Sequence, residues 1–290
     1  MSTTQIRLGG VPEHFNLPVH LAAERGEFAR RGVELAWTTF RGGTGEMTRA
    51  LREGTVDSCI LLTEGIIADL IAGNPCKIVS GYVDTPLTWG VHTGAGSSLR
   101  HHGEAYGGRY AISRFGSGSH LMAIVDADVQ GRTLAREQFT VVGNLEGALT
   151  SLTRGDTDVF YWEKYTTKPY VDDGRLRRIG EFVTPWPCFV VAATDEVIAR
   201  APEALTRTLR VLHDSCDAFM QTDDASIGLV ADRYGLSVAD ATRWYHATQW
   251  AIHGWVSDKM LRSVVHSLRA AGIVADRQAV PELVWRRDRS

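Results

Sequence analysis

The sequence predicts an α/β protein made of two similar lobes with a ligand cleft between them. The pattern Leu-x-x-Gly-x-x-Asp occurs twice, at 51–57 and at 152–158, and each copy precedes a short apolar run. Each copy indicates a helix that ends at a glycine, followed by a buried strand. Strand-like and helix-like segments also alternate along the chain, stop near residue 94 and resume near residue 109. Because strands joined by helices form one layered unit, this interruption indicates two units.

In the first part of the chain, short apolar runs define the strands and amphipathic segments define the helices. The helix at 17–31 carries Leu17, Leu21, Ala22 and Phe28 on one face and ends before Gly32. Strands are expected at 6–11, 33–40, 56–62 and 77–83, and helices at 17–31, 45–52 and 64–72. This order predicts a mostly parallel sheet with helices on both faces.

After the glycine- and serine-rich stretch at 94–98, the same alternation returns and is followed by a helical C-terminal part. Strands are expected at 109–114, 138–142, 158–162, 176–182 and 188–193, and helices at 119–129, 146–153, 202–220, 225–234, 238–252 and 258–271. The chain therefore enters a second unit and then returns to the first. We expect residues 1–93 and 190–290 to form lobe one and residues 94–189 to form lobe two.

The composition is that of an ordinary globular protein and argues against several classes of function. Of the 290 residues, 44% are hydrophobic and 22% are charged, and the net charge is −3. This balance lacks the basic footprint that nucleic-acid binding favours. No apolar run approaches the roughly 20 residues of a membrane span. The spacings typical of metal ligands, such as H-E-x-x-H, are absent, so neither a metal nor a cofactor is expected.

The N-terminus and the cysteines predict a cytoplasmic protein. The chain leads almost directly into the expected strand at 6–11, without the basic and apolar segments of a signal peptide. The four cysteines are scattered and form no C-x-x-C pair, which fits a reducing compartment. A trimmed signal peptide and two disulfides remain open as alternatives. Without a signal peptide, a transporter partner is not expected.

A family resemblance rests on residues 22–35 and on the repeated pattern. The stretch reads Ala22-x-Glu24-x-Gly26-x-Phe28, with Gly32 and Leu35 following at the same spacing as in that family. It resembles the type II periplasmic binding-protein superfamily, in particular the sulfonate-, nitrate- and taurine-binding proteins and the thiamine-pyrimidine synthases. The resemblance implies two α/β lobes that close on a small ligand. It does not imply one ligand, because this fold hosts many binders and several enzymes.

Ligands of open α/β sheets bind beyond the carboxyl ends of the strands. The candidates of lobe one lie in such loops, and these are Glu13, His14, Asn16, Thr44, Thr63 and Glu64. Several have structural alternatives. Asn16, Thr44 and Thr63 are equally good helix caps, and Glu64 can simply complement a helix dipole.

The candidates of lobe two include the strongest indication of an anion site. Residues 113–120 combine glycines, hydroxyls and an arginine at the expected start of a helix, where free N–H groups favour an anion. The residues predicted to bind ligand here are Arg114, Ser117, Gly118, Ser119 and His120. Trp162 is expected to stack on a planar ligand. Trp89 and Trp186, in the segments that join the lobes, either line the cleft or are structural.

Two functions remain open at this stage. The first is a cytoplasmic protein that binds a small, anionic or planar organic ligand between its lobes. The second is a cofactor-independent lyase or dehydratase that acts on such a ligand. In the second case Glu13, His14 and Glu163 are the predicted catalytic residues, because they should face one another across the closed cleft and exchange protons with the substrate.

Overall fold

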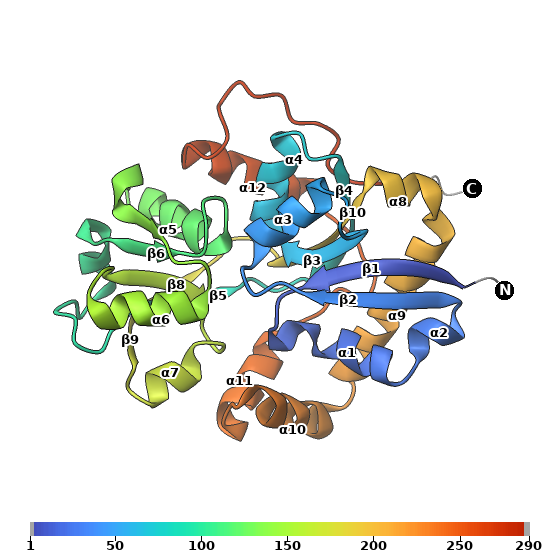
Figure 1. The fold of residues 1–290 in the computed structure, drawn as a ribbon, viewed down its shortest axis with the longest axis horizontal. Coiled ribbons are helices and arrows are strands. Elements are labelled where there is room, and N and C mark those ends of the chain that lie inside the picture. Colours follow the sequence, from blue (N-terminus) through green and yellow to red (C-terminus); the bar gives the residue numbers. More distant parts are fainter. Residues whose placement is uncertain (1–2, 287–290) are drawn as a thin grey trace.

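The structure, a computed structural model, describes residues 3–286 and contains two five-stranded sheets (Figure 1). The first sheet has the order β2-β1-β3-β10-β4 and the second has the order β7-β6-β8-β5-β9. The strands of the first sheet are β1 (Thr4–Gly10), β2 (Val33–Thr39), β3 (Ser58–Leu62), β4 (Cys76–Val83) and β10 (Phe189–Thr194). The strands of the second are β5 (Thr88–Gly94), β6 (Tyr110–Ile112), β7 (Phe139–Val141), β8 (Val159–Glu163) and β9 (Leu176–Val183).

The two sheets have the same topology. In the first, β1 is parallel to β2 and β3, whereas β10 is antiparallel to β3 and β4. In the second, β6 is parallel to β7 and β8, whereas β5 is antiparallel to β8 and β9. The antiparallel strands are β10 in the first sheet and β5 in the second. Each is the strand that the chain forms directly after crossing from the other sheet. The predicted pair of similar α/β units is confirmed.

Helices cover both faces of the first sheet. The helices before residue 100 are α1 (Leu17–Glu24), α2 (Glu27–Arg30), α3 (Thr44–Arg52) and α4 (Thr63–Ile71). In Figure 1, α3 and α4 lie on one side of this sheet, and α1, α2 and α9 (Pro202–Met220) lie on the other. The helix expected at 17–31 is interrupted, because Gly26 takes a left-handed conformation with φ of 69°.

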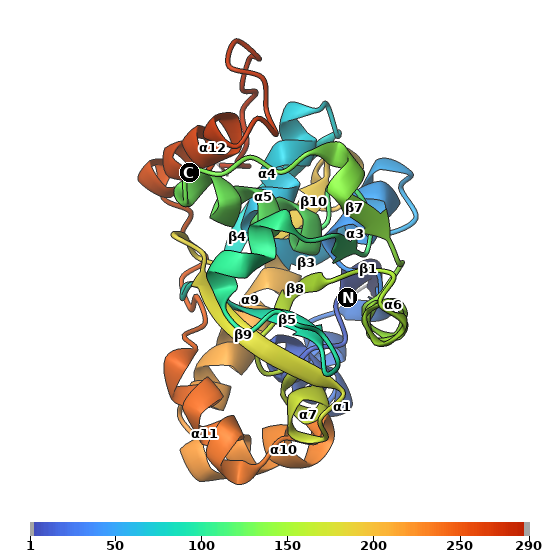
Figure 2. The same ribbon diagram turned by 90° about the vertical axis from the view of Figure 1, so that its left-hand side faces the viewer.

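The remaining helices belong to the second unit and to the C-terminal part. They are α5 (Gly118–Val129), α6 (Leu145–Arg154), α7 (Lys168–Asp172), α8 (Asp195–Arg200), α10 (Asp223–Tyr234), α11 (Val238–Ala247) and α12 (Asp258–Ala270), with short 3-10 turns η1 (His14–Asn16), η2 (His102–Gly107) and η3 (Arg136–Gln138). Figure 2 shows α7 of the second unit beside α10 and α11, which come from the end of the chain. Sequence reasoning did not predict α7 or β5.

The repeated pattern has a structural explanation. In the first copy, the Asp57 carboxylate accepts hydrogen bonds from the backbone and guanidinium N–H groups of Arg7, at 2.8–3.2 Å. In the second, the Asp158 carboxylate accepts the same set from Arg109, at 2.8–2.9 Å. Each arginine also donates to the carbonyl of the repeated glycine. The aspartate therefore joins the helix–strand turn to the neighbouring strand.

Two antiparallel segments connect the sheets. Residues 84–87 lead from β4 to β5, and residues 184–188 lead from β9 to β10. They are joined by backbone hydrogen bonds, in which Cys188 N donates to Thr85 O and Thr184 N donates to Leu87 O, both at 3.1 Å. The lobe limits at 93/94 and 189/190 stay a prediction. The second sheet itself begins with β5 at Thr88, before the expected limit.

Candidate functional site

A narrow cavity of about 30 Å³ lies where strand ends of the two sheets meet. This volume is close to that of a single water molecule. Its walls come from loops that follow β1 and β6, from the ends of β3 and β8, and from the starts of α3 and α5. The lining residues are Val11, Glu13, Gly43, Thr44, Leu62, Leu87, Trp89, Ser113, Gly118, Ser119, Trp162, Glu163 and Phe189.

A wider cavity of about 220 Å³ adjoins the narrow one, and the two share Val11, Glu13 and Trp162. Its other lining residues are Pro12, His14, Arg41, Leu145, Glu146, Tyr165, Thr166, Pro169, Tyr170 and Tyr234. Both sheets contribute to this cavity as well. A bound molecule in either cavity would therefore touch both halves of the protein.

The structure brings most of the predicted polar and aromatic candidates to these cavities. Those that line the narrow cavity are Glu13, Thr44, Trp89, Gly118, Ser119, Trp162 and Glu163. His14 lines the wider one. The predicted residues that line neither of these two cavities are Asn16, Thr63, Glu64, Arg114, Ser117, His120 and Trp186.

His14 and Glu163 form a buried ion pair between the two halves. His14 Nε2 lies 3.4 Å from Glu163 Oε2, and the side chains are 2% and 4% exposed. The His14 ring also packs against Trp244, with the ring centroids 4.3 Å apart. Burial alone would raise the pKa of Glu163, but His14 and the amide N–H groups of Thr166 and Tyr165 outweigh it and hold the pKa below its usual value.

Glu13 is a second buried carboxyl group at this place. It precedes η1, is 8% exposed and lines both cavities. Burial raises the pKa of Glu13 to about 8, and the charge of Glu163 adds to the increase. At pH 7 the two carboxyl groups therefore differ, with Glu163 ionised and Glu13 mostly protonated. Such a pair can both accept and donate protons.

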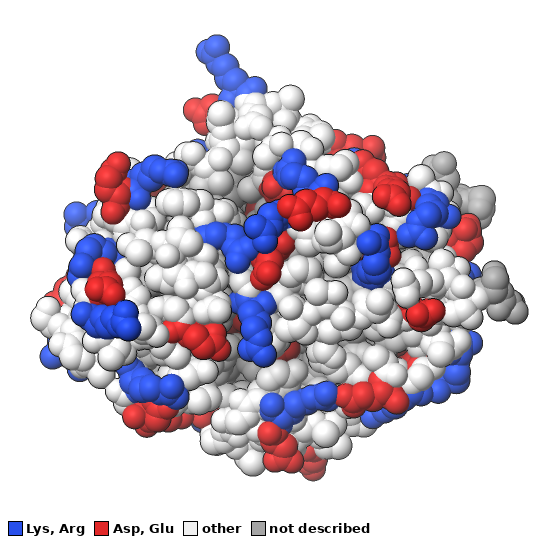
Figure 3. Space-filling view, in the orientation of Figure 1, with Lys and Arg blue, Asp and Glu red and all other residues white. Residues whose placement is uncertain are grey.

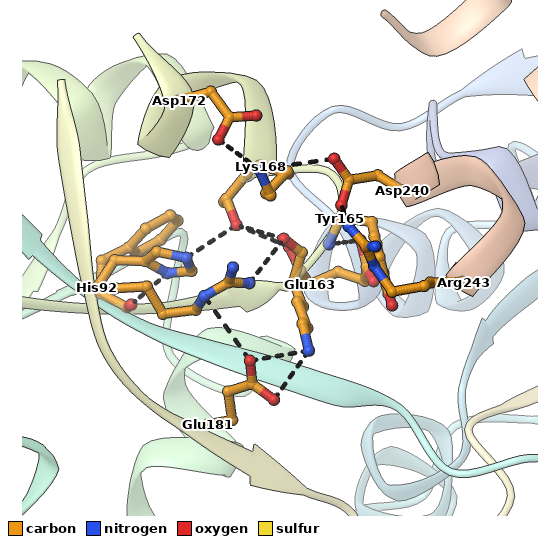
Figure 4. A network of polar contacts seen from close by, with 12 residues as sticks. His92, Glu163, Tyr165, Lys168, Asp172, Glu181, Asp240 and Arg243 are labelled. Carbon is orange, nitrogen blue, oxygen red and sulfur yellow. Dashed lines mark hydrogen bonds and ion pairs between the residues drawn. The ribbon is translucent and has the colours of Figure 1, made fainter. Parts of the chain in front are cut away.

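The turn after β8 holds Glu163 in place (Figure 4). The Thr167 hydroxyl contacts His92 Nε2 at 2.9 Å and donates to the Glu163 carbonyl at 3.0 Å. One residue further on, Lys168 of α7 lies 3.5 Å from Asp240 of α11, which also binds Arg243. The turn that orients Glu163 is thus tied to the C-terminal helices as well as to its own sheet.

Two tryptophans form aromatic walls of the narrow cavity. The β5 and β8 strands place Trp89 directly opposite Glu163, and Trp162 precedes Glu163. Trp162 stacks on Phe160, with ring centroids 5.2 Å apart. The indole Nε1 atoms of Trp89 and Trp162 are buried and have no hydrogen-bond acceptor among the described residues. A buried N–H without a partner is costly, so the Trp89 indole is available to a ligand. The Trp162 indole also interacts with the Glu13 carboxyl group, where it opposes the rise in the pKa of Glu13.

The starts of α3 and α5 face the narrow cavity from opposite halves. Thr44 begins α3, and Gly118 and Ser119 begin α5. Helix starts present free N–H groups and a partial positive charge. The Ser119 hydroxyl contacts Ser117 Oγ at 3.0 Å and accepts from Ser113 N. The loop at 113–119 is thereby held in a fixed shape around the cavity.

Arg114 lies against the start of α3 without lining either cavity, and His120 faces a different part of the surface. A β-carbon placed on Gly42 would lie 2.0 Å from Arg114 Nη2, so the Arg114 side chain covers the loop before α3. His120 accepts a hydrogen bond from Gly116 N and packs on Phe139, in a different surface hollow. Burial lowers the pKa of His120 to about 4, so it supplies no cation at pH 7.

Asn16 and Thr63 are engaged by the backbone. Asn16 Nδ2 donates to Val11 O at 2.8 Å, and its side chain does not cap α1. The Thr63 hydroxyl donates to Pro187 O at 2.7 Å. The Ser117 hydroxyl similarly donates to Arg114 O at 2.7 Å. These three side chains shape the strand-end loops and the connection between the sheets.

Glu64 and Trp186 pair with each other at the connection between the sheets. Trp186 Nε1 donates to Glu64 Oε2 at 2.9 Å, and both side chains are buried. Burial raises the pKa of Glu64 to about 7. Neither lines the two cavities, and their hydrogen bond ties the start of α4 to the segment at 184–188. Their predicted contact with a ligand stays a prediction.

Glu64→Gln is expected to stabilise the protein at neutral pH. Between the ordinary carboxyl pKa of 4.5 and the folded value of about 7, the folded state binds a proton that the unfolded chain has released. The contribution of Glu64 to the free energy of unfolding therefore falls as pH rises through this range, by on the order of 1–3 kcal/mol. Glutamine keeps the acceptor for Trp186 without that loss. Urea unfolding at pH 5 and pH 7.5 checks this, and an unchanged pH dependence would contradict it.

Sequence reasoning missed several lining residues. Leu62 and Ser113 were not named as candidates, although they lie at the ends of expected strands, where the strand-end rule places ligand contacts. Tyr234 of α10 and Phe189 of β10 carry no such signal. They reach the cavities only because the C-terminal helices and the returning strand fold back onto the first sheet.

Residues 3–286 offer neither a metal site nor a membrane-spanning helix. In that range there is no group of three or more His, Cys, Asp or Glu side chains placed to hold a metal ion. No helix in the same range is both long and apolar enough to cross a bilayer. On the face seen in Figure 3, acidic and basic side chains are interspersed, and they do not form a broad field of one sign.

Comparison with solved structures identifies the fold. The CA3427 gene product of Candida albicans, described as having the generic periplasmic binding protein fold, superposes with a TM-score of 0.89 and is 24% identical, over 98% of this chain and 99% of that chain. The protein has the type II periplasmic binding-protein fold. A family model described as Ca3427-like PBP matches residues 89–182. Comparison with curated protein sequences found no match.

More distant structures share this fold. The alkanesulfonate-binding protein SsuA of Xanthomonas axonopodis pv. citri, bound to MOPS, gives a TM-score of 0.81 at 17% identity, over 99% of this chain and 100% of that chain. The nitrate-binding protein NrtA of Synechocystis PCC 6803 gives 0.69 at 14% identity, over 95% and 83%. The predicted resemblance to the type II periplasmic binding-protein superfamily is confirmed at the level of fold.

Proposed function

We propose that the protein binds a small, planar or anionic organic ligand in the narrow cavity between its lobes. The observation that carries this proposal is the composition of the cavity wall. Two indole rings, two carboxyl groups and two helix starts from opposite halves of the protein meet around one space. Aromatic walls with a few convergent polar groups are typical of small-molecule sites.

The size of the cavity indicates that the lobes must separate before a ligand enters. About 30 Å³ accommodates a water molecule but no organic ring. Only two short segments, at 84–87 and 184–188, join the sheets, and such a pair can act as a hinge. Ligand binding is therefore coupled to opening and closing, as the fold suggests.

The ligand can be sought directly by native mass spectrometry of the purified protein. A bound molecule adds its mass to the folded protein and is released on denaturation. Trp162→Ala is expected to lower retention about tenfold, because a lost aromatic contact costs about 1 kcal/mol or more. Trp255→Ala, at an exposed indole outside both cavities, is the matched control. Equal retention by both variants would contradict the proposed site.

A second candidate function is a cofactor-independent lyase or dehydratase. It is favoured by one observation, the buried pair of His14 and Glu163 beside the protonated Glu13. If the retained molecule is a substrate, incubation should convert it, and chromatography with mass detection would follow the conversion. Glu163→Gln and His14→Ala should then slow turnover of the bound substrate, measured at saturating substrate, by about 10²–10⁴-fold. Normal turnover in both variants would reject this function.

The proposal includes a cytoplasmic location. Cys59, Cys76, Cys188 and Cys216 are all buried and unpaired, which supports a reducing compartment. Fractionation of cells that express the native gene, followed by immunodetection, tests this. Recovery in an exported fraction would contradict the location without affecting the binding site.

A further inference from the structure

The polar groups of the narrow cavity are separated along its length. Glu13 and Trp162 lie where the narrow cavity joins the wider one. Glu163 lies at the same end, because it pairs with His14, which lines the wider cavity. The helix starts at Thr44 and Gly118 line the narrow cavity but not the wider one. The two carboxyl groups and the two helix starts therefore lie at opposite ends of the cavity.

The acidic end lacks a full complement of positive charge. Glu163 pairs with His14, whereas Glu13 has no basic side chain within 4.0 Å among the described residues. Glu163 also accepts hydrogen bonds from the amide N–H groups of Tyr165 and Thr166, at 2.9 and 2.6 Å, so Glu13 is the carboxyl group left without a charged partner. Buried carboxylates require hydrogen-bond donors or cations. A ligand that brings N–H donors or a positive charge to this end would supply what the protein lacks.

The other end requires acceptors. The first N–H groups of α3 and α5 point to the start of each helix, where an anionic group is favoured. From its position opposite Glu163, the Trp89 ring reaches the start of α5, because a β-carbon on Gly118 would lie 2.6 Å from Trp89 Cη2. Trp89 is 3% exposed, and its Nε1 atom has no acceptor among the described residues. A ligand carboxylate or similar group at this end would satisfy these donors.

We propose that the ligand is bipolar, with a planar ring that carries an amidinium-like or amino donor at one end and an anionic group at the other. Glu13 and Glu163 bind the donor end, and the starts of α3 and α5 bind the anionic end. This inference rests on the proposed function and names its ligand class. A ligand that has only an anionic head leaves the two carboxyl groups unmatched.

The proposal has a consequence for pH. Binding of a cationic group beside Glu13 removes the proton that Glu13 carries at pH 7, because its pKa in the unliganded protein is about 8. Affinity for such a ligand should therefore rise as pH increases from 6 to 8, with proton release on binding. The other titratable and charged groups around Glu13 in the two cavities are His14, Arg41, Glu146, Glu163, Tyr165, Tyr170 and Tyr234.

Three rigid probes of similar size test the proposal by isothermal titration calorimetry of the full-length protein. They are 4-amidinobenzoate, which has both groups, benzoate, which has only the anion, and benzamidine, which has only the cation. We expect 4-amidinobenzoate to bind at least about tenfold tighter than either of the others at pH 8, since charge-assisted hydrogen bonds at both ends add. Its binding enthalpy should depend on the buffer, because a proton is released.

Variants assign the acidic end. Glu13→Gln and Glu163→Gln should each lower the affinity for 4-amidinobenzoate by at least about tenfold. The affinity for benzoate should fall by less than about twofold. Glu13→Gln should also abolish the pH dependence. Glu181→Gln, at an exposed carboxylate outside both cavities, is the charge-matched control and should change neither probe.

The outcomes separate this inference from the proposed function. Benzoate binding that equals or exceeds 4-amidinobenzoate binding overturns the bipolar ligand and leaves the anion-binding function standing. Benzamidine binding that equals 4-amidinobenzoate binding also overturns the bipolar ligand, since the anionic end then contributes nothing. Binding of none of the three overturns both. Loss of fold in a variant would be visible by circular dichroism, and the comparison among the three probes on the native protein then decides the question.

Discussion

Asp57→Asn is expected to lower the free energy of unfolding by about 3 kcal/mol, and the equivalent change Asp158→Asn by about 1 kcal/mol. Both aspartates accept the same hydrogen bonds from an arginine of the neighbouring strand. The Asp57 side chain is 3% exposed and also binds Arg200, whereas the Asp158 side chain is 32% exposed. Hydrogen bonds and ion pairs at the buried Asp57 carboxylate are screened less by water than those at the partly exposed Asp158 carboxylate, so their loss costs more. Urea unfolding followed by circular dichroism measures both changes.

The pH dependence of these variants gives an internal control. Burial alone would raise the pKa of Asp57, but its bonds to Arg7 and the charge of Arg200 hold it below the ordinary value. The stabilisation is therefore complete above the unfolded pKa and is lost as pH falls through the folded value. Asp57→Asn should be less sensitive to acid than the native protein in this range. If Asp57→Asn and Asp158→Asn lower the free energy of unfolding by the same amount at pH 7, the burial of Asp57 does not have the effect expected here.

Gly118→Val is expected to reduce ligand affinity by about 100-fold, because it prevents the lobes from closing. A β-carbon on Gly118 would lie 2.4 Å from Leu62 Cδ1 and 2.6 Å from Trp89 Cη2. Leu62 belongs to the first sheet, so the added methyl groups would push the halves apart. Small-angle X-ray scattering should show that the variant stays extended when 4-amidinobenzoate is added.

A matched substitution tests the specificity of this effect. Gly96 also lacks a positive φ, and a β-carbon there would have no heavy atom within 4 Å. Gly96→Val should therefore bind and compact as the native protein does. Ligand-induced compaction in Gly118→Val would contradict the close approach of Leu62 on which the prediction depends.

The site residues found by sequence reasoning share one physical cause. Strand ends converge at one edge of an α/β sheet, so polar residues that follow strands gather there without further information. Glu13, Thr44 and Glu163 were placed by this rule and do line the narrow cavity. The rule did not separate the side chains that face the cavity from those that turn into the protein. Glu64 begins α4 after β3, yet its carboxyl group faces Trp186.

Local pattern by itself determined most of the strands and helices and the existence of two similar units, because the burial of short apolar runs and the glycine ends of helices depend on near neighbours. Only the tertiary structure decided what the repeated aspartate does, since its arginine partner lies on another strand. It also decided that His14 packs against Trp244 and meets Glu163. These contacts join residues that are far apart in the sequence. The local pattern around His14 therefore does not identify Trp244 or Glu163 as its partners.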